Sequence, residues 1–116
     1  MSALTLLFWL LVGHAVADYP LQGDFLARAK NHRAPVVAAN GQAFPWWIAL
    51  AAHALIQGGA VALVTGSVLL GVAETVVHFA IDYATSEGRT GGYVGDQALH
   101  VACKVLWVAL ALWGHA

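Results

Sequence analysis

Histidines and aspartates recur in this chain at a spacing that brings them together on helices. Each of the four apolar stretches contains a histidine, and in three of them an aspartate lies four residues away. A separation of four places two side chains on one helix face, one turn apart. Neutral imidazole and carboxylate groups are the usual ligands of zinc, iron, manganese and nickel. The three pairs are His14 with Asp18, His78 with Asp82, and Asp96 with His100.

The remaining apolar stretch, the second along the chain, carries His53, with Gln57 four residues later. If successive stretches cross a membrane in opposite directions, position along each helix converts into depth at about 1.5 Å per residue. The aspartates then lie nearest one membrane face, the histidines about one turn deeper, and Gln57, Glu74 and Lys104 one turn deeper again. All four helices place polar groups at matching heights, which favours a shared site over separate hydrogen-bonded pairs that only hold the helices together.

We therefore predict a site for a divalent metal ion, with zinc favoured over manganese, iron or nickel. The number of donors suits either one metal with hydrogen-bonded outer carboxylates or a two-metal centre with an open position for water. Asp18 or Glu74 would accept a proton from the bound water. For Glu74 a buried ion pair with Lys104 is the favoured interpretation, and a role as a further metal ligand or as the general base is the alternative. The predicted metal ligands are His14, His53, His78, Asp82, Asp96 and His100.

The composition predicts a membrane protein. Of the 116 residues, 60% are hydrophobic and 9% are charged, and the mean hydropathy is +0.72. A soluble domain is about one quarter charged. The net charge is -1 with no basic tract, which argues against nucleic acid as a partner. Cys103 is the only cysteine, and we expect it to pack as a small apolar side chain.

The apolar stretches predict an all-α fold: an integral membrane, antiparallel four-helix bundle in one domain, residues 1–116. The first stretch also resembles a secretory signal, but it lacks Lys and Arg, so we expect a retained helix. Apolar residues at helical spacing between Pro20 and Pro35 predict a helix that lies at the membrane interface or extends the first span beyond a kink. The spans are short against the roughly 20 residues that cross a bilayer. They are predicted at 2–18, 45–64, 68–83 and 96–113, with a glycine-rich loop at 86–95.

The basic residues predict an orientation. Four of the five Lys and Arg residues fall in the first and third connections between spans, which places those connections in the cytoplasm and both termini on the opposite side. His32 and His115 lie outside the apolar stretches, and we expect them to be solvated. Trp107 is interpreted as a packing or boundary residue. The four basic residues are Arg28, Lys30, Arg33 and Arg89.

The candidate residues also form a longer pattern. The strings at 13–22, 78–82 and 96–100, with the His53 segment, resemble a family of small polytopic membrane proteins of bacteria and phages, described only as a domain of unknown function. Its pattern is His-x-x-x-Asp-Phe/Tyr-x-Leu-Gln, then a histidine, then His-x-x-Ile-Asp, then Asp-Gln-x-x-His. The resemblance covers nearly the whole chain and adds Gln22 and Gln97 to the candidates. Pro20 and the lack of a lysine soon after Asp82 depart from the pattern.

Three functional hypotheses follow. The first is a metalloprotein of the bacterial inner membrane, with a hydrolytic site at the cytoplasmic interface that acts on a lipid or another amphiphile. The second is a proton or metal-ion conduit relayed by the His–Asp pairs, although the opposite half of the helices offers only Thr5, Thr65 and Ser67 as polar residues. The third is a non-catalytic membrane subunit or phage accessory protein. In each case the short spans leave room for a homo-oligomer or a membrane protein partner.

Overall fold

The computed structural model describes residues 1–114 and is all-α, as predicted. Within these residues there is no β-strand, and one isolated bridge joins Val37 to Ala43. His115 lies outside the described residues. The helices are α1 (Ala3–Asp18), α2 (Gly23–Ala29), α3 (Trp46–Thr65), α4 (Val68–Ser86) and α5 (Tyr93–Trp113).

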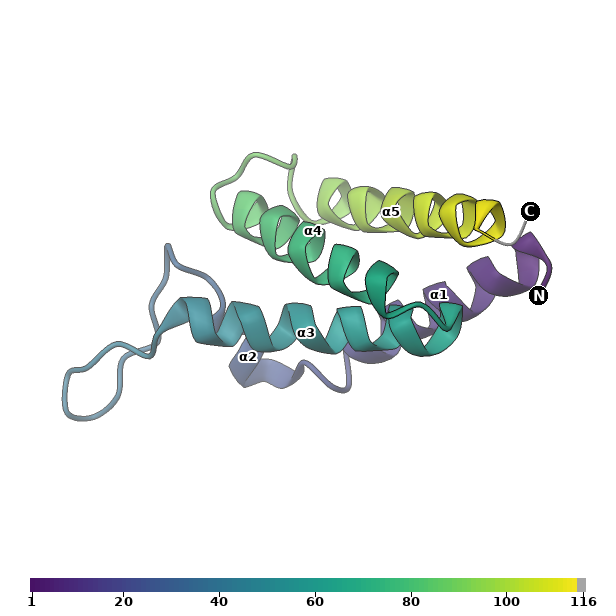
Figure 1. Cartoon of the computed structure of the whole chain (residues 1–116). Coiled ribbons are helices and arrows are strands. Elements are labelled where there is room, and N and C mark those ends of the chain that lie inside the picture. The colour runs from purple at the N-terminus through teal and green to yellow at the C-terminus, as the bar shows by residue number, and fades with distance from the viewer. Residues whose placement is uncertain (115–116) are drawn as a thin grey trace.

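The four long helices enclose a common interior. Helix α1 packs against α3 and α5, and α4 also packs against α3 and α5, while the short α2 contacts α3. The start of α1 and the end of α5 lie at one end of the molecule, and the α2–α3 connection and the α4–α5 loop lie at the other (Figure 1). The histidines of all four long helices can therefore meet in one interior.

Three helices, α3, α4 and α5, are long and apolar enough to cross a membrane. Helices α1 and α2 together form a fourth candidate, bent by 84° at the break between them. Pro20 lies in this break and supplies no backbone N–H to continue α1. Helix α2 confirms the helix predicted between Pro20 and Pro35, and the bend turns it back against α3.

Two glycines allow α3 and α4 to approach closely. A Cβ added at Gly58 would lie 1.9 Å from Thr75 Oγ1, and one added at Gly71 would lie 2.7 Å from the Gly58 carbonyl oxygen. Any larger residue at either position would force the helices apart. This contact sets the distance between the two helices that carry His53 and His78.

The α4–α5 loop is shorter than the predicted 86–95 segment. Helix α4 continues through Ser86, and α5 begins at Tyr93, three residues before the predicted start at Asp96. Gly92 has a φ of +90°, a backbone conformation that favours glycine, and the helix starts directly after it. Asp96 therefore lies in the first turn of α5, where the helix dipole stabilises its negative charge.

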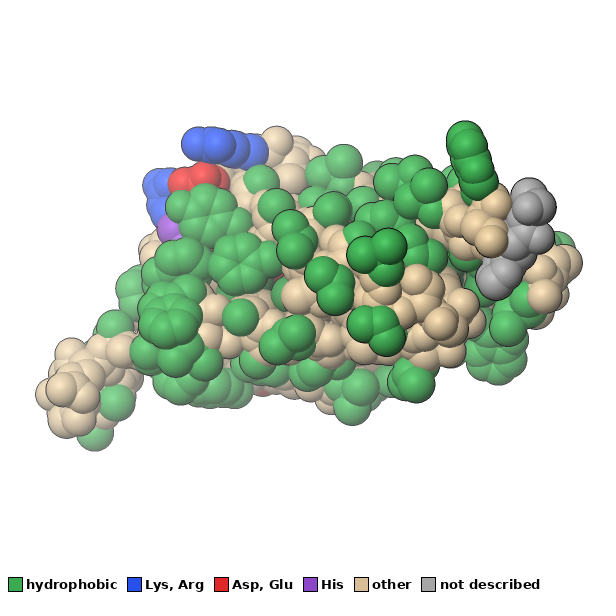
Figure 2. Space-filling model, viewed as in Figure 1, with side chains coloured by type: hydrophobic (Ala, Val, Ile, Leu, Met, Phe, Trp, Pro, Cys, Tyr) green, Lys and Arg blue, Asp and Glu red, His purple; other side chains and the backbone are tan. Residues whose placement is uncertain are grey.

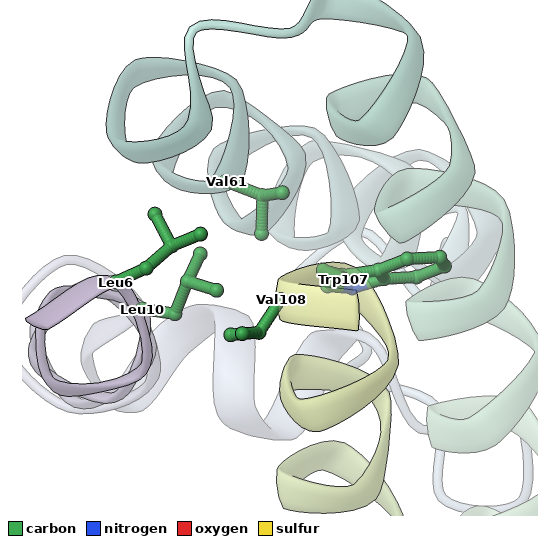
Figure 3. Packing of buried hydrophobic residues seen from close by; sticks show 5 residues of the cluster. All are labelled: Leu6, Leu10, Val61, Trp107 and Val108. Atoms are coloured by element: carbon green, nitrogen blue, oxygen red, sulfur yellow. The ribbon is translucent and has the colours of Figure 1, made fainter. Parts of the chain in front are cut away.

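Apolar side chains fill the interior near the chain termini. Figure 3 shows this cluster, and Cys103 packs against it as predicted. On the outer face in Figure 2, hydrophobic side chains cover the helices and the visible charged side chains gather near the α4–α5 loop. This distribution suits helices surrounded by lipid. The buried cluster consists of Leu6, Leu10, Val61, Trp107 and Val108.

Candidate metal centre

The other half of the interior holds a buried polar cluster drawn from all four long helices. The three predicted i,i+4 pairs are confirmed: the nearest side-chain atoms lie 3.9 Å apart for His14–Asp18 and 3.4 Å apart for both His78–Asp82 and Asp96–His100. Buried polar groups require partners, and most of these side chains contact one another. The buried members are His14, His53, Gln57, Glu74, His78, Asp82, Asp96, His100 and Lys104.

His78 is the most strongly oriented histidine of the cluster. Its Nδ1–H donates to Glu74 Oε2 over 3.0 Å, and neither residue is exposed to solvent. A neutral imidazole that donates from Nδ1 has a bare, electron-rich Nε2. A carboxylate behind the opposite nitrogen is also the usual support of a metal-binding histidine.

The Nε2 of His78 faces two further donor atoms. It lies 3.1 Å from His53 Nε2 and 3.4 Å from Asp82 Oδ2, and the latter two atoms are also 3.4 Å apart. Ligand atoms at about 2.0–2.1 Å from a tetrahedral zinc ion are about 3.3–3.4 Å from one another. The three atoms thus have the mutual spacing of ligands around one metal ion.

Asp18 borders the same group from α1. Its Oδ1 lies 3.3 Å from His53 Nε2 and accepts a hydrogen bond from Gln57 Nε2 over 3.3 Å. Asp18, His53 and His78 each offer a ligand atom within 4.8 Å of the others. Asp18, considered above as a proton acceptor, is therefore close enough to act on a water that a metal ion at His53 and His78 would bind.

A second set of donors surrounds the other oxygen of Asp82. His100 Nε2 lies 2.9 Å from Asp82 Oδ1 and 3.4 Å from Asp96 Oδ1. Thr85 Oγ1 donates to Asp96 Oδ1 over 2.5 Å and fixes that carboxylate. Asp82, Asp96 and His100 form a separate group with ligand atoms within 4.8 Å of one another.

Lys30 is a member of the cluster that sequence reasoning missed. Its Nζ donates to Asp82 Oδ2 over 3.0 Å, although the two residues are 52 positions apart. Lys30 follows directly after α2, and the 84° bend brings it over the site. A basic residue in a polar connection carries no periodic signal, so only the bend reveals this contact. A metal ion at Asp82 Oδ2 would displace the ammonium or use the second lone pair of that oxygen.

His14 lies beside the two donor groups rather than within them. Its Nε2–H donates to Gln97 Oε1 over 3.0 Å, and Gln97 Nε2 donates to Asp18 Oδ2 and to Asp96 Oδ2, each over 3.1 Å. A third group with the same spacing consists of Glu74, His78 and His100, and among the described residues His14 belongs to none of the three. The structure therefore gives His14 and Gln97 contacts that orient the two aspartates.

Glu74 and Lys104 form the predicted buried ion pair. Lys104 Nζ donates to Glu74 Oε1, and Trp107 Nε1–H donates to the same oxygen over 3.0 Å. Trp107 packs in the apolar cluster, as predicted, and its hydrogen bond adds a partner that the sequence did not indicate. Glu74 is fully buried and acts on the site through His78.

His32 differs from its prediction as a solvated residue. Its ring stacks on Tyr83 with centroids 4.1 Å apart and planes 4° apart, and its side chain is only 12% exposed. Trp46 lies on the same cluster, with its centroid 5.2 Å from that of His32. The imidazole is flat and aromatic enough to pack between these rings, which the polar neighbours in the sequence did not suggest.

A cavity of about 380 Å³ gives access to the cluster. Asp18, Asp82 and Asp96 all line it, together with Lys30 and Gln22. Gln22 Nε2 donates to the Asp18 carbonyl oxygen over 3.0 Å. Tyr19 and Tyr93 also line the cavity, and their hydroxyl groups contact each other. The carboxylates are thus reachable, whereas His53 and His78 lie deeper.

The cluster carries an excess of negative charge. Four carboxylates, those of Asp18, Glu74, Asp82 and Asp96, face only two ammonium groups, those of Lys30 and Lys104. Uncompensated charge in a low-dielectric interior is costly. Two protons on histidines or one divalent cation would balance the excess.

Comparison with known proteins gives a family but no activity. A family model described as "Protein of unknown function (DUF3307)" matches residues 6–115, nearly the whole chain. Searches of curated proteins and of solved structures found no match.

Proposed function

The chain belongs to the DUF3307 family of unknown function, and we propose that it is an integral membrane metalloprotein that hydrolyses a lipid or another amphiphile. The observation that carries the proposal is the triangle of His53 Nε2, His78 Nε2 and Asp82 Oδ2, with edges of 3.1, 3.4 and 3.4 Å. Lone pairs that converge in this way repel one another unless a proton or a metal cation lies between them. Two histidines and one carboxylate are a common zinc ligand set.

Three protein ligands leave a fourth position for water, as in catalytic zinc sites. A zinc ion lowers the pKa of its bound water to about 7, which supplies a nucleophile at neutral pH. Asp18 Oδ1, 3.3 Å from His53 Nε2 and on the cavity wall, is placed to accept the proton. Zinc fits this ligand set best, and manganese, iron and nickel are the alternatives that metal analysis would separate.

The four long helices are proposed to cross the bacterial inner membrane as a short antiparallel bundle. The basic residues of the first and third connections favour a cytoplasmic position for those connections and for the polar cluster beside them. Both chain ends then lie on the opposite side. The head group of a membrane lipid would meet the cavity at the level of the interface.

An apolar groove beside the polar cavity supports an amphiphilic substrate. The groove, about 410 Å³, lies between α1 and α3 and is lined almost wholly by apolar atoms, including those of Gly59 and Leu63. Ala17 and Leu21 line the groove, and their neighbours Asp18 and Gln22 line the polar cavity. One acyl chain in the groove would therefore bring its head group to the site.

The apolar cluster near the chain termini argues for hydrolysis over ion conduction. Leu6, Leu10, Val61, Trp107 and Val108 fill the interior between the polar cluster and that end of the molecule. An ion path needs polar groups or water throughout the membrane thickness. A single chain with this packing keeps its polar chemistry at one face.

The first prediction concerns metal content. Protein extracted in mild detergent should contain at least one divalent ion per chain by elemental analysis, and chelation should lower its thermal midpoint. A ligand that binds only the folded state, at about 1,000 times its Kd, stabilises that state by about 4 kcal/mol. Absence of stoichiometric metal, with an unchanged midpoint after chelation, would refute the metalloprotein and leave a packing role for the cluster.

The second prediction tests the acyl-chain groove with Gly59→Leu. A Cβ at Gly59 meets no atom within 4 Å, so the Gly59→Leu variant should fold and its leucine side chain should project into the groove. With 4-methylumbelliferyl esters as substrates, we expect KM for the oleate to rise by about tenfold, since buried methylenes contribute about 0.8 kcal/mol each, and KM for the butyrate to stay unchanged.

Leu55→Phe is the matched control, because Leu55 is 62% exposed on the same helix and does not line the groove. Equal effects of Gly59→Leu on both esters, or an equal effect of Leu55→Phe, would contradict an acyl chain in the groove.

A further inference from the structure

Asp82 presents its two carboxylate oxygens to two different sets of donors. Oδ2 faces His53 and His78 at 3.4 Å each, and Oδ1 faces His100 at 2.9 Å. A carboxylate placed in this way between two sets of nitrogen donors is the geometry of a bridging ligand. In two-metal sites the ions are about 3.5–4 Å apart, a span that the two oxygens of one carboxylate can bridge.

From this arrangement we infer that the chain binds a second divalent cation, held by Asp82 Oδ1, Asp96 Oδ1 and His100 Nε2. The inference rests on the proposed function, because Asp82 is shared with the first ion. His100 Nε2 lies 3.4 Å from Asp96 Oδ1, which matches the edge of a metal coordination shell. It also donates to Asp82 Oδ1 over 2.9 Å, a hydrogen bond whose proton the ion would replace. The second ion binds to one nitrogen and two oxygens, a set that also suits manganese.

The second position lies nearer the cavity than the first. Asp82 and Asp96 line the cavity, whereas His53 and His78 are fully buried. The second ion therefore keeps an open coordination position that faces the cavity, where water or a substrate oxygen can bind. It should also exchange with solution faster than the deeper ion.

The net charge of the cluster with two ions bound indicates which kind of head group it would bind. One divalent cation balances the two excess negative charges of the cluster, so a second leaves two excess positive charges. Hydroxide or an anionic head group in the cavity would balance them, with Lys30 beside it. The two-metal centre therefore favours an amphiphile with an anionic head group over a neutral one.

The test is a Mn²⁺ titration of detergent-purified, metal-stripped protein, with bound metal counted by equilibrium dialysis and Mn–Mn coupling followed by electron paramagnetic resonance. We expect two ions per chain and a coupled spectrum in the wild type, and one ion with an uncoupled spectrum in Asp96→Asn. Asp24→Asn removes the same charge from an exposed residue whose ion pair, among the residues that the structure describes, is with Arg28, and it should retain two ions.

One ion in the wild type, or two in Asp96→Asn, overturns the second site and leaves the first intact. No ion in the wild type overturns the proposed function as well. The wild-type titration decides the inference even if Asp96→Asn fails to fold.

Discussion

Asp82→Asn should abolish metal binding more completely than any other single substitution of the cluster. Asp82 contacts His53, His78 and His100, and it supplies both of its oxygens to the site. Asparagine keeps the shape but removes the negative charge, and it replaces one oxygen by an N–H₂ group that cannot bind metal. Loss of an outer partner alone costs 10–100-fold in metal affinity, so loss of this ligand should cost more than about 100-fold.

Metal per chain after mild extraction, and the Kd for Zn²⁺, are the measurements. The thermal midpoint of Asp82→Asn should no longer respond to chelator, while Lys30, which is 18% exposed, can turn toward solvent and limit the loss of stability. Asp24→Asn is again the matched control and should bind metal as the wild type does. If Asp82→Asn bound metal with wild-type affinity, the proposed centre would be wrong.

The helices were predictable from the sequence because the apolar stretches and their breaks are local signals. Proline near the start of α3 and the glycine after its end, Gly66 with a φ of +71°, mark its limits within about one residue. The start of α5 was harder to predict from the sequence, because Tyr93 and Val94 follow two glycines and resemble loop residues. Helix α5 nevertheless begins at Tyr93, directly after Gly92, whose φ of +90° is a backbone conformation that favours glycine.

The convergence of histidines and aspartates was also predictable, because a spacing of four fixes which side chains share a helix face. The rotation of each helix about its axis was not. This rotation puts Asp18 close to His53 and leaves His14 against Gln97. Lys30 and the stack of His32 on Tyr83 depend on the path of the chain after the bend at Pro20, which no periodic pattern encodes.

Glu74→Gln should destabilise the protein strongly, because it leaves the ammonium of Lys104 buried without a counter-charge. Lys104 is 1% exposed and Glu74 is fully buried. Breaking a buried pair by removing one partner costs about 3–5 kcal/mol, whereas replacing both partners by groups of similar size is often neutral. The double variant Glu74→Gln/Lys104→Met should therefore recover most of the stability lost in Glu74→Gln, as measured by the thermal midpoint in detergent with chelator present.

Metal affinity separates the second role of Glu74 from its ion pair. Glu74 accepts from His78 Nδ1–H over 3.0 Å, and a carboxylate in that position raises the basicity of the metal-binding nitrogen. The double variant should regain its stability but keep a Zn²⁺ affinity about 10–100-fold below that of the wild type. Lys104→Met alone keeps the Glu74 side chain behind His78 but removes its counter-charge, so this variant is the control for affinity only when its thermal midpoint is measured as well. Recovery of both stability and affinity in the double variant would reduce Glu74 to a counter-ion of Lys104, because His78 would then be oriented without it.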